Sequence, residues 1–445
     1  MKKILRYILV APVALMTVAM TGCSESDADK DQGKDPKVSY FRYTDPATAN
    51  EHITEAYLGE KIAICGSDMG DVQQIWFNDQ KAMLNPAYVT SDVIIVEIPN
   101  AISENVTNTV RLVTSKGNAT TVDFYTMVPE PIISSMSCEW ANPGDVVEIN
   151  GDYFVTDDEY PIQVTFPGGA TVSQDDILSF SRTQMTVKVP QGATQEGRVT
   201  ATTRYGEGLA SFVWRDTRGM ILDWDGTHGQ AVALANGWRK GDKILHSGSY
   251  NGIPALDGNF ICFDGIKADY NDMGEDQFSF SHWPVDENGI TSLDISTLFD
   301  TANYLDYCLK FEAYIPAATP WTICALNIMF TPASIFGEND YYFGEDAPYP
   351  YPRAMWVPWN SNGGSFDTAD KWVTVTIPMS EFNKDRYMNP CSRKMTKDDF
   401  AGLSMIVSWG PFMEETNVPT AMTETSTIKV LPTPLSSGTT VHISL

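Results

Sequence analysis

The chain has 445 residues, which at ordinary domain sizes corresponds to about three domains. Its formal net charge of −27 and its pI near 4.4 repel a phosphate backbone, so no nucleic-acid partner is expected. The seven cysteines contain no CxxC pair and the chain has five histidines, so we expect neither a disulfide framework nor a zinc site, and no cofactor. The cysteines in apolar, strand-like runs are predicted to be buried free thiols: Cys65, Cys262, Cys308 and Cys324.

The N-terminus has the pattern of an export signal. Lys2, Lys3 and Arg6 precede an apolar run that is too short to span a membrane, and Met20-Thr21-Gly22-Cys23 resembles a lipobox. We therefore predict a signal peptide over residues 1–22 and a lipid on Cys23. Residues 23–36 are polar and charged, which predicts a flexible tether. Acidic residues after the lipidated cysteine resemble an export signal for the outer face of the Gram-negative outer membrane, so we expect an outer-membrane lipoprotein that faces the exterior.

Two segments then resemble each other. AYLGEKIAICG ends at Gly66 and ANPGDVVEING ends at Gly151, and each is followed by a short strand and a β-branched strand closed by proline. Short strands with frequent turns predict two small immunoglobulin-like sandwiches, over residues 37–128 and 129–215. The pattern resembles the IPT/TIG family, whose modules usually act as spacers. Ligand binding by one module, through Trp76 or Trp140, stays open as the alternative.

Residues 216–445 differ from the preceding residues in composition, because most of the tryptophans of the chain lie there. Strands are predicted at residues 304–315, 322–330, 372–378 and 403–409. Tyr307, Leu309, Phe311, Ala313 and Ile315 alternate as one face of the first of these strands. The fold class is therefore all-β, with two immunoglobulin-like sandwiches followed by a larger, jelly-roll-like sandwich. The clustering of tryptophan predicts that residues 216–445 bind ligand alone and that residues 37–215 alone do not.

The stretch YPYPRAMWVPWNSNGG, residues 349–364, combines aromatic rings with prolines that cannot donate to a sheet ladder. It is predicted to be an edge strand or a shaped loop. Such rings can form a flat surface that stacks on the C–H face of a sugar, here called an aromatic platform. They can equally fill the core, and in a regular strand Trp356 and Trp359 would face opposite ways unless Pro358 breaks it. The candidate platform residues are Trp283, Trp321, Tyr351, Trp356 and Trp359.

Several runs in this last part carry a more specific resemblance. LDWDG, YCLKFEAYIP with Trp321 after it, VPW at residues 357–359 and KWVTVTIPMSEF resemble the terminal domain of the surface glycan-binding proteins of polysaccharide-utilisation systems. That family has a lipid anchor, IPT-like spacers and a terminal binding sandwich. The resemblance implies non-catalytic capture of xyloglucan or another β-glucan, and association with a TonB-dependent glycan transporter complex. The segment SSGTTVHISL departs from the family, because it runs on past the usual closing strand.

Other functions remain as alternatives. An adhesin would bind a protein through the spacer domains. A glycoside hydrolase would need two carboxylates across a cleft, and no catalytic motif such as GxSxG or HExxH is present, so we expect no enzyme. The segment DYNDMGED, residues 269–276, is read as a solvated acidic loop, with a structural calcium site left open because Met273 occupies a ligand position.

Overall fold

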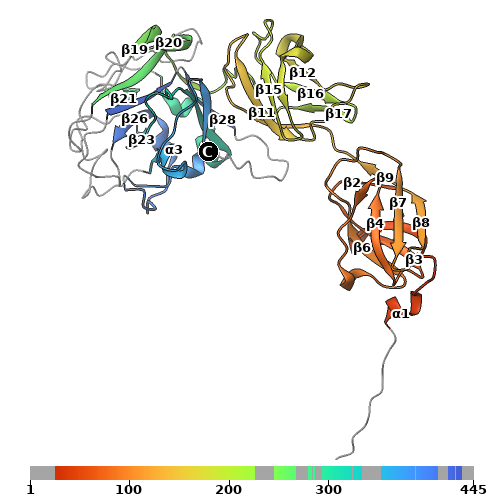
Figure 1. The fold of residues 1–445 in the computed structure, drawn as a ribbon. Helices are drawn as coiled ribbons and strands as arrows, with labels where there is room; N and C mark the ends of the chain where they lie inside the picture. The colour runs from red at the N-terminus through yellow and green to blue at the C-terminus, as the bar shows by residue number, and fades with distance from the viewer. Residues whose placement is uncertain are drawn as a thin grey trace, which may run out of the picture. The chain divides into compact units, whose positions relative to one another are not determined.

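The computed structural model describes residues 26–225, 245–266, 279–282, 284–285, 293–322, 324–332, 352–385, 387–408, 419–425 and 427–432. Strands form nearly all of the regular structure, which confirms the all-β prediction (Figure 1). The chain divides into two compact units, Met1–Pro129 and Glu130–Leu445. Among the described residues, no helix is both long and apolar enough to cross a membrane.

The first unit is an immunoglobulin-like sandwich. One layer has the strand order β1-β3-β6, the other has the order β5-β4-β7-β8, and β2 pairs in parallel with β9. The core between the layers holds Phe41, Phe77 and Phe124, whose rings lie 4.6 Å and 6.0 Å from one another in the Phe41–Phe124 and Phe77–Phe124 pairs. The elements are α1 Asp27–Asp31, β1 Lys37–Tyr43, η1 Pro46–Thr48, β2 Glu55–Tyr57, β3 Lys61–Ser67, β4 Val72–Phe77, β5 Gln80–Lys81, η2 Pro86–Tyr88, β6 Val93–Glu97, β7 Thr109–Thr114, β8 Ala119–Asp123 and β9 Tyr125–Met127.

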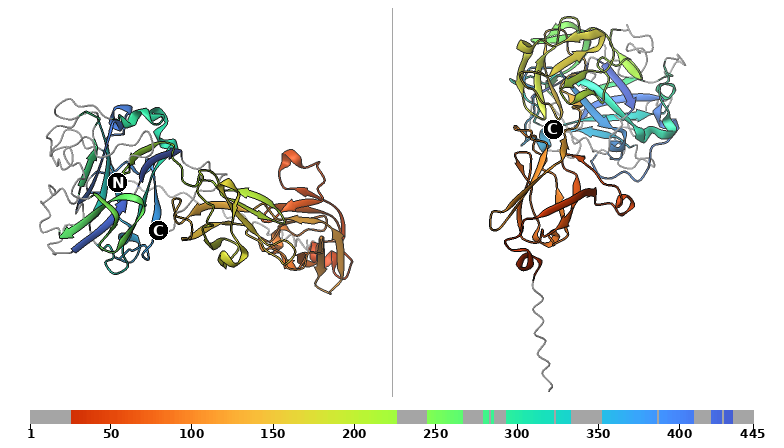
Figure 2. Two further views of the ribbon diagram at one scale, coloured as in Figure 1. Left: turned by 90° about the horizontal axis from the view of Figure 1, so that it is seen from above. Right: turned by 90° about the vertical axis from the view of Figure 1, so that its right-hand side faces the viewer.

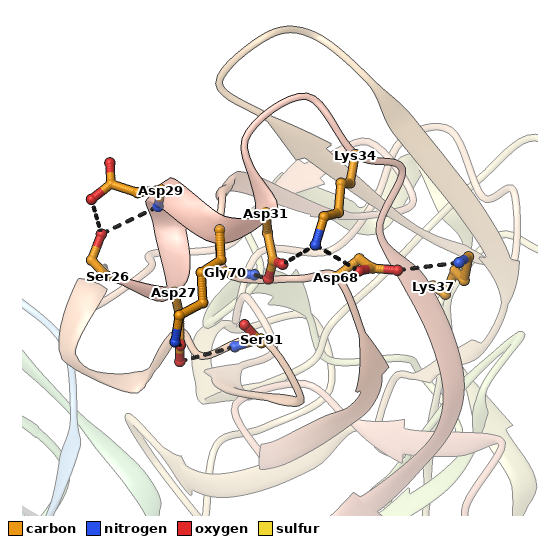
Figure 3. Close-up of polar contacts among 10 residues, drawn as sticks. Ser26, Asp27, Asp29, Asp31, Lys34, Lys37, Asp68, Gly70 and Ser91 are labelled. Atoms are coloured by element: carbon orange, nitrogen blue, oxygen red, sulfur yellow. Dashed lines mark hydrogen bonds and ion pairs between the residues drawn. The ribbon is translucent and has the colours of Figure 1, made fainter. Parts of the chain in front are cut away.

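Residues 26–36, here called the N-terminal clip, are docked on this sandwich rather than free. Asp31 is buried and accepts a hydrogen bond from the Gly70 N–H at 2.9 Å. Figure 3 shows the Lys34 ammonium between the carboxylates of Asp31 and Asp68, at 3.0 Å and 3.2 Å. The Ser91 N–H donates to Asp27 at 3.3 Å. The predicted flexible tether is therefore wrong from Ser26 onward, because its acidic residues accept hydrogen bonds from backbone N–H groups of the sandwich and its Lys34 pairs with Asp68.

Burial by itself would raise the pKa of the Asp31 carboxyl. The hydrogen bonds from Gly70, Ser91 and Lys34 outweigh that effect and hold the pKa below its ordinary value. The carboxylate therefore stays ionised where it is buried, and the clip keeps its ion pair at neutral pH.

The second sandwich repeats the topology of the first, with the orders β10-β11-β15-β14 and β13-β12-β16-β17. The glycines that marked the sequence repeat have matching roles. A Cβ on Gly66 would lie 1.8 Å from the Lys37 carbonyl oxygen, and one on Gly151 would lie 1.8 Å from that of Ile132. Only glycine lets the adjacent strand approach so closely. The elements are β10 Ile132–Met136, β11 Val146–Asp152, β12 Gln163–Phe166, η3 Pro167–Gly169, β13 Ala170–Thr171, η4 Gln174–Asp176, β14 Ile177–Phe180, β15 Gln184–Lys188, β16 Thr200–Thr203 and β17 Gly206–Leu209.

The terminal domain packs the sheet β18-β28-β22-β25 against the sheet β21-β26-β23-β24, with β19-β20-β27 as a third sheet (Figure 2). Leu309 and Phe311 of β22 share one core with Leu326 and Ile328 of β23. The elements are β18 Met220–Asp223, β19 Leu245–Tyr250, β20 Ile253–Ile266, β21 Ser279–His282, η6 Ile295–Thr297, η7 Thr301–Asp306, β22 Tyr307–Ala313, β23 Ala325–Thr331, β24 Ala354–Trp356, α3 Pro358–Ser361, β25 Val373–Pro378, η8 Met379–Glu381, η9 Lys397–Phe400, β26 Gly402–Ser408, β27 Pro419–Thr425 and β28 Thr427–Pro432.

The strands predicted in this domain are present as β22, β23, β25 and β26. The prediction started the first of them too early. Residues 301–306 form the short helix η7 instead, because the Asp300 carboxylate caps it by accepting from the Ala302 N–H at 3.1 Å. The predicted buried thiols are confirmed for Cys65, Cys262, Cys308 and Cys324, which are buried and form no disulfide bond.

Strand β22 is buried on both faces, although its sequence alternates. Leu309 and Phe311 face the core of the terminal domain, while Lys310 and Glu312 point the other way. The Lys310 ammonium forms an ion pair with Glu139 of the second sandwich at 2.5 Å, and the two side chains are 4% and 5% exposed. Backbone contacts join the same surfaces, since the Thr374 N–H donates to the Ser137 carbonyl at 2.8 Å. The second sandwich and the terminal domain are therefore packed together through a buried polar interface.

Candidate functional site

The aromatic stretch of the terminal domain forms an edge strand that breaks into a short helix. Strand β24 pairs with β23, with Trp356 opposite Leu326, and has no strand on its other side among the described residues. Pro358 then occupies the first turn of α3, where its missing N–H costs no hydrogen bond. The prediction of an edge strand is confirmed. Because the strand ends before Pro358, strand alternation does not determine the direction of the Trp359 side chain relative to that of Trp356.

Trp321 and Trp356 lie in the core, with 1% and 5% of their surface exposed. Their rings meet edge to face, with centroids 5.2 Å apart and planes at 72°. Phe311 packs on Trp356 at 5.5 Å from the other sheet, and the backbone of Phe366 exchanges hydrogen bonds with that of Trp321. The expectation that these two rings belong to an exposed platform is corrected, because the sandwich closes over them to bury their large apolar area.

Trp359 is the candidate that reaches the surface in the described part of the chain. Its side chain is half-buried, and its indole N–H donates to the Cys324 carbonyl at 2.8 Å, which fixes the ring. The residues that follow, Asn360 to Gly364, are exposed. The Asn362 side chain donates to the Ser365 carbonyl at 2.8 Å and holds this turn. A ring fixed beside exposed amide and hydroxyl groups can stack on a sugar while those groups bond to its hydroxyls.

The remaining candidates cannot be placed in the same way. Trp283 and Tyr351 lie outside the described residues, as does Cys23 at the predicted lipidation site. The tentative calcium segment, residues 269–276, also lies outside them. Within the part of the chain that the structure describes, no group of acidic, histidine or cysteine side chains is arranged to hold a metal ion.

A polar row on the outer face of the sheet β21-β26-β23-β24 was missed by the sequence reading. The Ser404 hydroxyl donates to that of Ser281 at 3.0 Å, and the Arg353 guanidinium reaches the Asn327 amide oxygen at 3.5 Å. All of these side chains are buried. The sequence feature that could have predicted this row is Asn327 within the apolar run ALNIMFT. Strand alternation points its side chain to the face of the sheet that Leu326 and Ile328 do not occupy. The row supplies hydrogen-bond donors and acceptors on the face that the hydrophobic core does not use.

His282 follows Ser281 of this polar row in the sequence, but its side chain has a structural role. Its Nε2 lies 2.8 Å from the Leu293 carbonyl oxygen, and the side chain is fully buried. Burial lowers the pKa of His282 below its ordinary value, which keeps the ring neutral. The ring therefore links β21 to the segment before η6 and is not presented to a ligand at the surface.

The tryptophans of the immunoglobulin-like domains give no clear binding surface. Trp140 is buried, with the Arg215 guanidinium 5.7 Å from its ring. Trp76 is half-buried, and its indole N–H bonds to the Gln74 side chain at 3.1 Å. Burial thus removes Trp140 as a platform residue, whereas ligand binding through Trp76, which is half-buried as Trp359 is, stays an alternative.

Comparison with known proteins identifies the last two domains. Residues 214–426 match the surface glycan-binding protein B xyloglucan binding domain, and residues 131–211 match the IPT/TIG domain. The crystal structure of the surface glycan-binding protein PbSGBP-B from Prevotella bryantii is similar with a TM-score of 0.69 and 28% identity, over 89% of this chain and 98% of that chain. The SGBP-B from a complex xyloglucan utilization locus in Bacteroides uniformis has 15% identity and a TM-score of 0.43, over 89% of this chain and 99% of that chain.

A curated relative covers a smaller part. An IPT/TIG domain-containing protein of Bacteroides ovatus is 27% identical over 220 residues, which are 44% of this chain and 43% of the relative. The chain thus matches less than half of the length of that relative. Residues 131–211 thus match the IPT/TIG domain and residues 214–426 match the xyloglucan binding domain of surface glycan-binding protein B, which confirms the resemblance predicted from the sequence.

Proposed function

We propose that this protein is a non-catalytic, cell-surface lipoprotein that captures a polysaccharide for uptake. The observation that carries the proposal is the match of residues 214–426 to a xyloglucan binding domain. PbSGBP-B, which is similar over most of the chain, is a surface glycan-binding protein. The described part of the terminal domain offers an aromatic ring, Trp359, beside exposed hydrogen-bonding groups.

The proposed ligand is xyloglucan or a related β-glucan. Such a chain is neutral and rich in hydroxyls, so the net charge of −27 does not repel it as it would repel a polyanion. A weak single site is sufficient, because a lipid-anchored array on a long polymer gains avidity.

The proposed contact surface lies around α3 of the terminal domain. Trp359 supplies a ring whose position is fixed by its bond to the Cys324 carbonyl. The aromatic core formed by Trp321 and Trp356 supports the segment from beneath. Trp283 and Tyr351 stay proposed glycan-binding residues on the basis of the sequence alone.

The proposed location is the outer membrane, through a lipid on Cys23, with the protein facing the exterior. The lipobox-like run Met20–Cys23 and the acidic residues after it support this proposal. A TonB-dependent glycan transporter is the proposed membrane partner, since capture at the surface serves uptake only if the polymer fragment is passed inward.

Affinity electrophoresis in gels that contain xyloglucan, mixed-linkage β-glucan or no glycan tests the function. We expect retardation in a β-glucan gel, and no release of reducing sugar when the same glycans are incubated with the protein. A matched gel with an anionic polysaccharide controls for retardation by charge. Unchanged mobility in every glycan gel would refute capture, and steady release of reducing sugar would instead support a hydrolase.

A further inference from the structure

The short parallel sheet of the first unit exposes aromatic rings on one face. Strand β2 pairs with β9, with Glu55 opposite Tyr125 and Tyr57 opposite Met127. Residues that pair across strands point to the same side, so these four side chains share a face. Tyr57 and Tyr125 are 45% and 55% exposed. We call this surface the tyrosine face.

The local sequence explains why these rings face outward. Ala56 and Phe124 are fully buried, and Phe124 packs on Phe41 and Phe77 in the core. Strand period then turns the adjacent Tyr57 and Tyr125 away from the core. Backbone bonds fix the strands, since the Tyr125 N–H donates to the Thr54 carbonyl at 2.9 Å. The rings are therefore presented by a rigid element and not by a loop.

Acceptors of hydrogen bonds surround the rings. The Glu60 carboxylate accepts from the Tyr57 N–H at 2.8 Å, and Glu55 is exposed next to Tyr125 in the pairing. The half-buried phenol of Tyr43 adjoins this group. Burial, followed by the negative charges of Glu60 and Glu55, raises the pKa of Tyr43 above its ordinary value. The face thus combines apolar rings with carboxylates that suit hydroxyl donors and repel anions.

This grouping differs from the other exposed apolar side chains of the first unit. Met83, Tyr88 and Val106 are also exposed, but they lie outside strands and are not paired with one another. Single exposed apolar residues are ordinary and need no function. Tyr57 and Tyr125 instead lie on the same face of two paired strands, two positions apart in the register.

We propose that the tyrosine face is a second contact site for the neutral polysaccharide that the terminal domain captures. The rings stack on the C–H faces of the sugars, and the carboxylates accept hydrogen bonds from their hydroxyls. The inference rests on the proposed function, since it assigns the same class of ligand to another domain. In Figure 1, β2 and β9 lie at the end of the first unit opposite to α1, so the N-terminal clip leaves this face uncovered.

A second weak contact acts only on ligands long enough to reach both domains. It converts part of the binding of a polymer into an intramolecular event, and it adds nothing for a short oligosaccharide held by the terminal domain. The site therefore makes the protein discriminate by chain length, with stronger retention of polymer than of its fragments.

The test compares polymer with oligosaccharide in the mature chain. We expect Tyr57→Ala combined with Tyr125→Ala to raise the Kd for high-molecular-mass xyloglucan about three- to tenfold, from the lost contact of the rings. The Kd for xyloglucan oligosaccharides should stay unchanged, and Tyr57→Phe with Tyr125→Phe should keep most of the polymer affinity. Tyr88→Ala, which removes an equally exposed tyrosine from the same domain, is the matched control.

The outcomes separate this inference from the proposed function. If the wild-type chain binds neither polymer nor oligosaccharide, the proposed function fails and the inference fails with it. If the wild-type chain binds polymer and the double alanine variant binds it equally well, the inference alone is overturned. A melting temperature equal to that of the wild type shows that the variant is folded, and the single alanine variants replace it if it is not.

Discussion

The buried ion pair between Lys310 and Glu139 allows a sharp test of how the terminal domain is held. The carboxylates of both Glu139 and Glu312 act on Lys310. The Glu312 carboxylate accepts a hydrogen bond from the Thr374 hydroxyl at 3.3 Å, and that hydroxyl accepts one from the Glu139 N–H at 2.8 Å. Burial lowers the pKa of Lys310, but the charge and hydrogen bond of Glu139, together with Cys308 and Glu312, outweigh this and raise the pKa above its ordinary value. The Lys310 ammonium is therefore charged, and it offsets the negative charges of the Glu139 and Glu312 carboxylates.

Lys310→Met should be the most damaging single change, since it leaves two buried carboxylates near one hydroxyl. Removing one partner of a buried pair costs about 3–5 kcal/mol. Glu139→Gln should cost less, about 1–3 kcal/mol, because Lys310 keeps Glu312 as a partner. At about 2 °C per kcal/mol for a large domain, Lys310→Met lowers the melting temperature by roughly 6–10 °C.

Differential scanning calorimetry of the mature chain measures these shifts. Lys384→Met is the matched control, because Lys384 pairs with Glu381 at 3.2 Å with side chains 30% and 51% exposed, and such pairs contribute about 0–1 kcal/mol. Replacing Lys310, Glu139 and Glu312 together by Met, Leu and Gln should recover most of the loss. A Lys310→Met variant that melts no lower than Lys384→Met would refute the reasoning.

Three further outcomes are expected. Asp31→Asn should speed amide hydrogen exchange in residues 26–36 without moving the main melting transition. The pKa of Asp31 is lower in the folded than in the unfolded chain, so its contribution to the stability of the clip is complete above the unfolded value, near 3.8, and is lost as the pH falls through the lowered pKa. Amide exchange measured in acid checks this pH dependence. Trp356→Ala should cost about 3–5 kcal/mol of stability by denaturant titration, whereas Trp359→Ala should mainly weaken xyloglucan binding. Residues 216–445 alone should melt below residues 130–445, because separation exposes the surface around Lys310, and equal melting temperatures would contradict this.

Strand period and turn chemistry were sufficient to predict much of the fold. The paired glycines Gly66 and Gly151 marked a true structural repeat, because both sit where a neighbouring carbonyl leaves no room for a Cβ. The alternation of Leu309 and Phe311 identified a core face of β22. These features depend on residues close in sequence, and local sterics act in the same way in every chain that contains them.

Tertiary structure alone decided what covers each face. Alternation placed Lys310 opposite to Leu309, but only the second sandwich, with Glu139 far away in sequence, buries it. Composition made Trp321 and Trp356 as suitable for a platform as Trp359, and the closing of two sheets over them put both in the core. The composition of the N-terminal clip predicted a tether, but contacts with Gly70 and Asp68, which are distant in the sequence, dock its Asp31 and Lys34 on the sandwich. Sequence sets the direction in which a side chain points, whereas burial depends on long-range packing that composition and period do not encode.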